Sequence, residues 1–192
     1  MPSIALQVWQ SRGRQALDEV EAAHAAVGGA GRGRRYATQQ INQAYVVLLC
    51  SQFQKFCRDL HTEGVDHLTS QPAFMPLAML LNTSIIVGRK LSVGNASPGN
   101  IGADFARFGF RFWDEVLRRD RRNGGRQAKL DELVRWRNAI AHQDFTSPML
   151  AGRETLRLSE VRAWRSVCES LAVEFDRVLG LYLLSITGVR PW

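Results

Sequence analysis

Apolar residues recur every three or four positions along most of this chain, and no stretch shows sustained apolar–polar alternation. A spacing of three or four places side chains on one face of an α-helix, whereas alternation is typical of a half-buried strand. The longest stripe, between Tyr36 and Glu63, consists of Ile41, Tyr45, Leu48, Leu49, Phe53, Phe56, Cys57 and Leu60. The sequence therefore predicts an all-α protein, a bundle of four to five principal helices.

Glycine-rich and turn-forming stretches divide this pattern into segments. We expect helices over residues 4–27, Tyr36–Glu63, Pro72–Leu91, Phe105–Arg119, Lys129–Ala141 and Ser159–Ile186, with a loop over Ser92–Asp104. Gly64 is the expected C-cap of the second helix and Ser159 the expected N-cap of the last. Gly124 and Gly125 are expected to form the break between the helices Phe105–Arg119 and Lys129–Ala141. Residues 1–35 would form an N-terminal helix and a basic Gly/Arg linker, and residues 36–188 a helical domain.

The most apolar run, Ala73–Gly88, spans 16 residues and contains Pro76, Asn82 and Ser84. A membrane-spanning helix needs about 20 apolar residues, so we expect a buried helix here and no membrane partner. The stretch MPSIALQVWQSRGR at the start lacks the apolar block of a signal peptide. The protein is therefore expected to be cytoplasmic.

The chain is strongly basic, with a formal net charge of +7 and arginine as 22 of its 25 basic residues. Guanidinium groups offer a rigid fork of donors that suits phosphate, which favours a nucleic-acid partner. A GC-rich genome would produce the same excess of arginine, so the charge leaves both explanations open. The densest cluster is RRDRRNGGR, Arg118–Arg126, in which Arg121, Arg122 and Arg126 are candidate RNA-binding residues.

Cysteines and histidines do not form a metal-ligand pattern in this sequence. Cys50, Cys57 and Cys168 include no C-x-x-C pair, and we expect them to be buried thiols in a reducing compartment. The four histidines show no metal-ligand spacing with one another or with a cysteine. The glycine-rich stretches match neither a dinucleotide-binding nor a phosphate-binding motif, so no metal or cofactor is predicted.

The stretch VRWRNAIAHQDF, Val134–Phe145, places an Arg, an Asn and a His at the end of an expected helix. Arg137, Asn138 and His142 lie within six residues of one another. An Arg followed by a His at such spacing arises about once by chance here, but the adjacent Asn at one fixed gap lowers the expectation to on the order of 0.01. An ordinary helix end is the alternative, because positive charge is favoured near a helix C-terminus.

The residues RNAIAH, Arg137–His142, resemble the R-[polar]-x-x-x-H motif of the HEPN superfamily. In those all-α domains the motif ends one helix and a long final helix follows, which is the order expected here. The resemblance extends over residues 36–188 through helix order and length. It implies a metal-independent endoribonuclease, used as a toxin or in defence against phage, whose active site forms where two protomers meet.

The chemistry of these residues is consistent with RNA cleavage by attack of the 2′-hydroxyl. His142 would transfer protons near neutral pH, Arg137 would stabilise the phosphate, and Asn138 would orient either group. Positions five apart on a helix point about 140° away from each other. Either the helix unwinds near His142, or a twofold axis brings Arg and His together from two chains, and we expect a homodimer.

Asp144 stands where some HEPN toxins carry a Tyr that a nucleotidyltransferase antitoxin modifies, so regulation by that route is not expected here. Asp144 could instead raise the pKa of His142 or cap the following turn, and the turn-forming sequence DFTSP favours the cap. Trp136 is the best candidate among the tryptophans for stacking on a base, against core packing as the alternative. Asp59 and Glu63 are weaker candidates for an auxiliary acid.

The leading hypothesis is therefore a HEPN-like endoribonuclease whose partners are RNA, a second copy and an antitoxin or defence-system protein. The alternative is a non-catalytic helical dimer that binds RNA or a partner protein. A DNA-binding regulator is weaker, because the basic residues are scattered and no helix-turn-helix is evident.

Overall fold

The computed structural model describes residues 1–28, 36–146, 148–150 and 152–192, and within these ranges it contains helices and no strands. The prediction of an all-α protein is confirmed. Four of the described helices have at least 15 residues: α2 (Arg14–Gly28), α3 (Tyr36–Ser70), α8 (Asn123–His142) and α9 (Leu158–Thr187). The expected Gly/Arg linker falls mainly on residues 29–35, which lie outside the described part of the chain.

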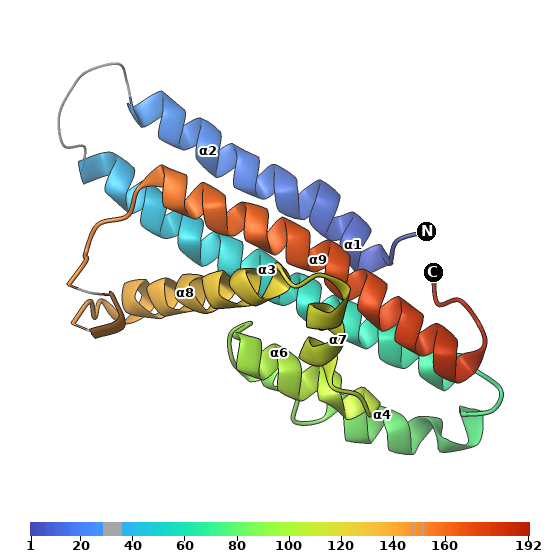
Figure 1. Cartoon of the computed structure of the whole chain (residues 1–192). Helices are drawn as coiled ribbons and strands as arrows, with labels where there is room; N and C mark the ends of the chain where they lie inside the picture. Colours follow the sequence, from blue (N-terminus) through green and yellow to red (C-terminus); the bar gives the residue numbers. More distant parts are fainter. Residues whose placement is uncertain (29–35, 147, 151) are drawn as a thin grey trace.

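Helices α3 and α9 run parallel through the centre of the bundle (Figure 1). Near their first turns, Asn42 Nδ2 donates to Leu156 O at 2.9 Å, and near their last turns His67 Nε2 lies 3.4 Å from Thr187 Oγ1. Most side chains of their facing apolar stripes are buried, although Ile41 and Leu48 of the predicted α3 stripe are only partly so. The members at 0% exposure include Leu49, Phe53, Leu60, Leu171, Phe175 and Leu179.

The N-terminal segment packs on this central pair. It consists of α1 (Ile4–Val8), a π-helical turn at Trp9–Gly13, and α2. Glu63 on α3 accepts hydrogen bonds from the backbone N–H groups of Ile4 and Ala5 at 2.8 and 3.0 Å. Arg165 on α9 contacts Asp18 on α2 at 2.6 Å. Residues 1–28 therefore contribute to the same core as α3 and α9.

A layer of shorter helices covers the other side of α3 (Figure 1). It contains η2 (Met75–Leu77), α4 (Ala78–Ile86), α5 (Lys90–Val93), α6 (Pro98–Phe105) and η3 (Ala106–Phe108). The next helix, α7 (Phe112–Arg119), packs on α9 and α8 instead. A last 3-10 turn, η4 (Pro148–Leu150), follows α8. The expectation of a loop over Ser92–Asp104 was wrong, because Ser97 Oγ accepts from Asn100 N at 3.2 Å and caps α6, with Pro98 in its first turn.

Other helix boundaries also differ from the prediction. The expected helix Phe105–Arg119 is interrupted, because Gly109 adopts a left-handed φ of 94° and α7 begins only at Phe112. Gly64 lies inside α3 and does not end it. A Cβ atom at position 64 would come within 2.9 Å of Leu179 Cδ2. Gly124 and Gly125 lie inside α8, and α9 begins at Leu158, so Ser159 is not its cap. Glycine suits position 64 because α9 approaches the backbone of α3 closely there, and a side chain would not fit.

The apolar run Ala73–Gly88 does not form the buried helix that its composition predicted. Only Ile85 is buried in α4, whereas Met79 exposes 85% and Leu80 62% of their surface. The 3-10 turn at Met75–Leu77 leaves a helix of nine residues, which has one face on α3. The expected single helix Pro72–Leu91 is instead divided into η2, α4 and the start of α5. Burial of its outer face would require a neighbour that the described chain does not supply.

Two other expectations concern membranes and thiols. Across the described residues, no helix is long and apolar enough to cross a membrane. Cys50, Cys57 and Cys168 are buried free thiols, as predicted, and burial raises the pKa of Cys50 to about 12. Each cysteine therefore behaves as a small core residue.

Candidate functional site

Helix α8 continues regularly through the RNAIAH stretch and ends at His142. Gln143 then adopts a left-handed conformation with φ of 53°, and Asp144 N donates back to Ala139 O at 3.0 Å. This reversal satisfies carbonyl groups of the last turn and carries the chain away from the helix. The helix does not unwind before His142, so one of the two expected ways of joining Arg137 to His142 is not observed.

Asn138 and His142 lie four residues apart and therefore share a face of α8. Together with Arg135, Ala139 and Asp144 they line a hollow of about 260 Å³. His142 is exposed, and none of the described residues forms a hydrogen bond with its ring. The ring is therefore accessible to a ligand in the hollow.

Asn138 is fixed by hydrogen bonds from two neighbours. Asn95 Nδ2 and Arg137 Nη1 donate to Asn138 Oδ1 at 3.1 and 3.2 Å. Asn95 is itself held, because Asn100 Nδ2 donates to its carbonyl oxygen at 2.9 Å. Since its oxygen is occupied, Asn138 would present its Nδ2 group to the hollow as a donor.

Arg137 is partly buried and is not among the residues that line the hollow with His142. The structure of one chain thus brings together Asn138, His142 and Asp144, and leaves Arg137 behind Asn138. The nearest guanidinium in the hollow is that of Arg135, which forms an i,i+4 ion pair with Asp131. A phosphate at His142 would need Arg135, or an arginine from a second chain, as its cation.

Asp144 caps the turn that follows α8. Its Oδ1 accepts hydrogen bonds from Thr146 N at 3.0 Å and Thr146 Oγ1 at 2.6 Å. These bonds lower the pKa of Asp144, and the charge of His142 lowers it further. The carboxylate therefore serves the turn, as the sequence favoured, and also contributes negative charge beside His142.

Trp136 belongs to the core, which corrects its interpretation as a base-stacking residue. It is 2% exposed, and its ring lies 6.4 Å from that of Trp164 and 6.3 Å from that of Phe145. Arg153 covers the ring at 5.4 Å from its centroid. The physical reason is the helical stripe of α8, in which Leu133, Trp136 and Ile140 share the inward face.

The basic cluster lies at the opposite end of α8 from His142. Arg122 Nε contacts both oxygens of Asp120 at 3.0 Å, and Arg126 Nη1 contacts Asp120 Oδ2 at 3.1 Å. The hydrogen bonds from Arg122 lower the pKa of Asp120 to about 2. Arg126 and His142 are separated by about 24 Å of helix, so they do not share a site within one chain.

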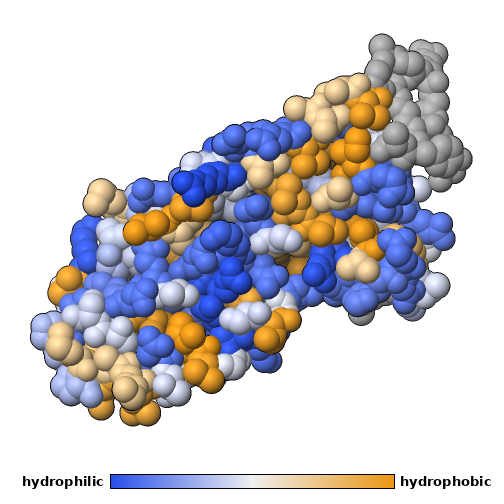
Figure 2. Space-filling model, turned by 180° about the vertical axis from the view of Figure 1, so that it is seen from behind, coloured by the Kyte–Doolittle hydropathy of each residue, from blue (hydrophilic) through white to orange (hydrophobic). Residues whose placement is uncertain are grey.

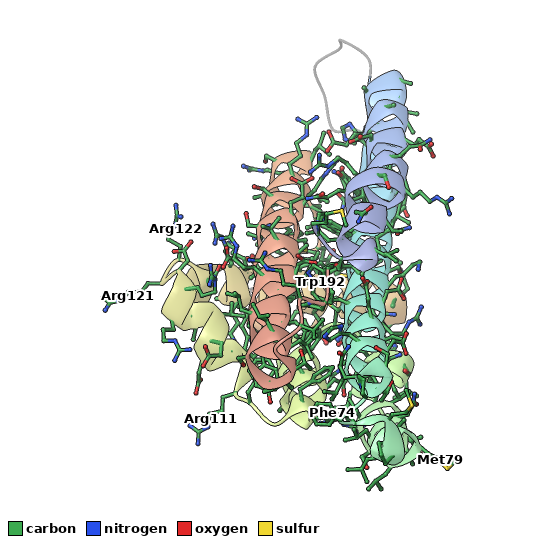
Figure 3. All side chains as sticks on the ribbon, turned by 90° about the vertical axis from the view of Figure 1, so that its right-hand side faces the viewer. Phe74, Met79, Arg111, Arg121, Arg122 and Trp192 are labelled. Atoms are coloured by element: carbon green, nitrogen blue, oxygen red, sulfur yellow. The ribbon has the colours of Figure 1, made fainter. Side chains whose placement is uncertain are left out.

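Arg121 and Arg122 point outward at that end, away from the side that carries Met79 (Figure 3). Arg122 leaves 81% of its side chain exposed despite its contact with Asp120. The arrangement suits long-range attraction of a polyanion, whereas catalysis at His142 would need the polyanion to extend along α8.

Sequence reasoning missed a buried polar cluster formed by His61, Arg89 and Asp104. Their exposures are 0%, 7% and 0%. His61 Nε2 lies 3.1 Å from Asp104 O, Arg89 Nη1 lies 3.3 Å from His61 Nδ1, and the Asp104 carboxylate accepts from Leu91 N at 2.7 Å. Burial lowers the pKa of His61 to about 4. Polar residues that meet only in the folded structure, from positions far apart in the sequence, give no local sequence signal.

Glu63 and Asp59 have structural partners. Glu63 caps the start of α1, and Asp59 forms ion pairs with Lys55 and Arg58. Neither lines the hollow at His142. Among the described residues, no group of three or more His, Cys, Asp or Glu side chains is arranged to hold a metal ion.

Comparisons of the chain with protein-family models, with curated proteins and with solved structures gave no significant match in any of the three.

Proposed function

We propose that this protein is a metal-independent endoribonuclease of the HEPN type that cleaves RNA at the end of α8. One observation supports it above the others: an exposed His142 and a fixed Asn138 line the same hollow, at the end of the helix that carries the RNAIAH motif. Such an arrangement provides a proton-transfer group and a neutral donor beside space for a phosphodiester.

His142 would accept the proton of the ribose 2′-hydroxyl or donate one to the leaving 5′-oxygen. General acid–base catalysis of this kind is worth a factor of about 10²–10⁴ in rate. Asn138, held by Asn95 and Arg137, would donate from Nδ2 to a phosphate oxygen. Attack by the 2′-oxygen on phosphorus leaves a 2′,3′-cyclic phosphate and a free 5′-hydroxyl end.

The positive charge for the transition state would come from arginine. Arg137 lies behind Asn138 in its own chain, so we propose that a second protomer supplies a guanidinium to the His142 hollow. Charged hydrogen bonds from arginine to phosphate oxygens would stabilise the charge that develops as the 2′-oxygen attacks. The protein would then act as a homodimer, in a toxin or anti-phage role with a partner protein that restrains or triggers it.

The decisive experiment is cleavage of labelled RNA by purified protein in excess EDTA. We expect wild-type protein to leave cyclic-phosphate ends, and a folded His142→Ala variant to be slower by at least 100-fold. His24→Ala is the matched control, because it makes the same substitution at a histidine of α2 that does not line the hollow. Equal cleavage by wild type and His142→Ala across varied RNAs would refute the assignment.

A second candidate function is a non-catalytic helical dimer that binds RNA or a protein partner. The exposed apolar side chains of η2 and α4 favour it, because large apolar patches mark interaction surfaces. In that case wild type and His142→Ala would be equally inactive, and expression of either would leave cell growth unchanged.

A further inference from the structure

The outer face of η2, α4 and α5 carries several large apolar side chains that are exposed. Of the large hydrophobic side chains that are exposed, a cluster comes from residues 75–93: Met75 60%, Leu77 51%, Met79 85%, Leu80 62%, Val87 66% and Val93 92%. We call these six side chains the apolar face. Figure 2 shows hydrophobic side chains gathered at the end of the molecule that α4 forms.

The local fold explains why these side chains face outward. Helix α4 has nine residues and packs on α3 through Ile85, with Leu81 and Ile86 partly buried beside it. Met79 and Leu80 lie on the opposite side of the helix, and Figure 3 shows Met79 projecting away from the body of the protein. No described segment folds over this side, so its apolar atoms remain in water.

The size of the apolar face fits a protein interface. Six side chains that are each at least half exposed present on the order of 600 Å² of apolar surface. A stable protein–protein interface buries about 800 Å² on each partner. The partly buried Phe74 and the polar rim of α4 at Asn82 and Thr83 would supply the remainder.

The charge distribution indicates which partner fits. The chain carries a net charge of +7, yet the eighteen residues from Gln71 to Gly88 include no charged side chain. Arg107, which lies beside this segment, directs its guanidinium to the carbonyl oxygens of Ile85, Val87 and Gly88 at 2.7–3.2 Å. The segment Gln71–Gly88 thus offers no cation of its own to a nucleic acid or an anionic membrane, and the exposed Lys90 lies just beyond it on α5. Two copies of a basic chain can therefore meet at this uncharged segment with little repulsion.

We propose that the apolar face of η2, α4 and α5 is a homodimer interface at which it packs against the same face of a second copy. An isologous contact buries both patches at once and brings α4 of one protomer against α4 of its partner. The chain leaves this face at Val93 and reaches Asn95, whose side chain bonds to Asn138. Two copies would associate through this face whether or not the protein cleaves RNA.

The first test measures mass in solution by sedimentation velocity over a range of micromolar concentrations. We expect wild-type protein to be a dimer and Leu80→Glu to raise the dimer dissociation constant at least tenfold. Leu181→Glu is the matched control, because Leu181 on α9 is also exposed, at 49%, but lies outside the apolar face. A monomeric wild type, or a dimer unaffected by Leu80→Glu, would overturn the proposal.

The second test uses the burial of the native thiols. Cys50, Cys57 and Cys168 are 7%, 0% and 0% exposed, so a cysteine introduced at the surface reacts selectively. We expect Met79→Cys to form a covalent dimer with a short bismaleimide, and Leu181→Cys to form none. Cross-linking of both variants alike, or of neither, would contradict an interface at α4.

A lipid surface is the other occupant that such a face could have. Wild-type protein is mixed with neutral and with anionic vesicles and sedimented. We expect Leu80→Glu to leave any vesicle binding unchanged, since the segment Gln71–Gly88 that carries Leu80 has no cation to attract a lipid headgroup. A monomer that binds vesicles through Leu80 would replace the dimer with a membrane contact.

Discussion

His61 on α3 and His142 on α8 are the same residue type in opposite surroundings. His61 is fully buried, and both ring nitrogens lie within hydrogen-bond distance of a partner, Arg89 Nη1 on one side and Asp104 O on the other. Because Arg89 can only donate, Nδ1 of His61 accepts and Nε2 carries the hydrogen. His142 is exposed at a helix end, without a hydrogen bond to its ring from the described residues.

The difference separates structure from chemistry. A ring whose two nitrogens are occupied contributes to stability and cannot exchange a proton without breaking the fold around it. A ring at a hollow can exchange protons with a ligand, and its loss costs the fold little. Substitutions at the buried histidine should therefore change stability, and substitutions at the exposed one should change activity.

The largest expected effect on stability comes from His61→Ala. It removes buried ring atoms and leaves Arg89 and the Asp104 carbonyl without a partner, so the free energy of unfolding should fall by about 4 kcal/mol. Urea unfolding followed by circular dichroism measures it. His142→Ala should change the same quantity by less than about 0.5 kcal/mol, and equal losses in both variants would break the contrast.

Acid should expose the same contrast in the wild-type protein. Burial lowers the pKa of His61 to about 4, whereas the unfolded chain titrates near 6.5. Between these values the unfolded state binds more protons, so stability is full above pH 6.5 and falls by up to about 3 kcal/mol as the pH drops to 4. Urea unfolding at pH 7, 5.5 and 4.5 should show the fall, and a His61→Gln variant should lack most of it. A profile identical in the variant would assign the acid sensitivity to other groups.

Two glycines extend the comparison from side chains to backbone packing. A Cβ atom at Gly64 would meet Leu179 Cδ2 at 2.9 Å and Phe108 Cζ at 3.1 Å, so Gly64→Ala should destabilise the protein by about 2 kcal/mol. Gly125 in α8 has nothing within 4 Å of its Cβ position, so Gly125→Ala should stabilise it by about 0.5–1 kcal/mol. Thermal unfolding of both variants measures this. If Gly64→Ala also stabilised the protein, α9 would have to move aside for the added methyl group.

The smallest effect concerns the exposed arginines and any RNA that they attract. Arg121→Gln should reduce the slope of log binding constant against log salt by about 0.7, the value for one phosphate contact on a single strand. Arg122→Gln should reduce it less, because Arg122 already contacts Asp120. Fluorescence anisotropy with labelled single-stranded RNA at several salt concentrations measures both slopes. Unchanged slopes would remove the basic cluster from the RNA surface.

Helical periodicity carried most of the fold prediction. The helices α3 and α9 were predicted because apolar residues recur at helical spacing along many of their turns, and on α8 Leu130, Leu133, Val134 and Ile140 are buried at the same spacing. Gly64 and the segment Ala73–Gly88 were misinterpreted, because their positions depend on neighbours that are distant in sequence. Leu179 leaves no room for a side chain at position 64, and no described segment covers Met79, which is exposed.

The candidate site was predictable only along one helix. The four-residue spacing that places Asn138 and His142 on one face follows from helix geometry alone. The fixing of the Asn138 side chain depends in part on Asn95, which comes from a different layer of the protein. The cluster of His61, Arg89 and Asp104 depends on contacts between residues 28–43 positions apart, which no spacing rule reveals.

The most direct test measures RNA cleavage and unfolding together for His142→Ala and His61→Gln, in excess EDTA. We predict that His142→Ala loses 10²–10⁴-fold in cleavage rate while its unfolding midpoint stays that of wild type. His61→Gln should lose stability but cleave at the wild-type rate at a temperature where it remains folded. Full cleavage by His142→Ala, or a cleavage loss in folded His61→Gln as large as that of His142→Ala, would contradict the assignment of the end of α8 as the active site.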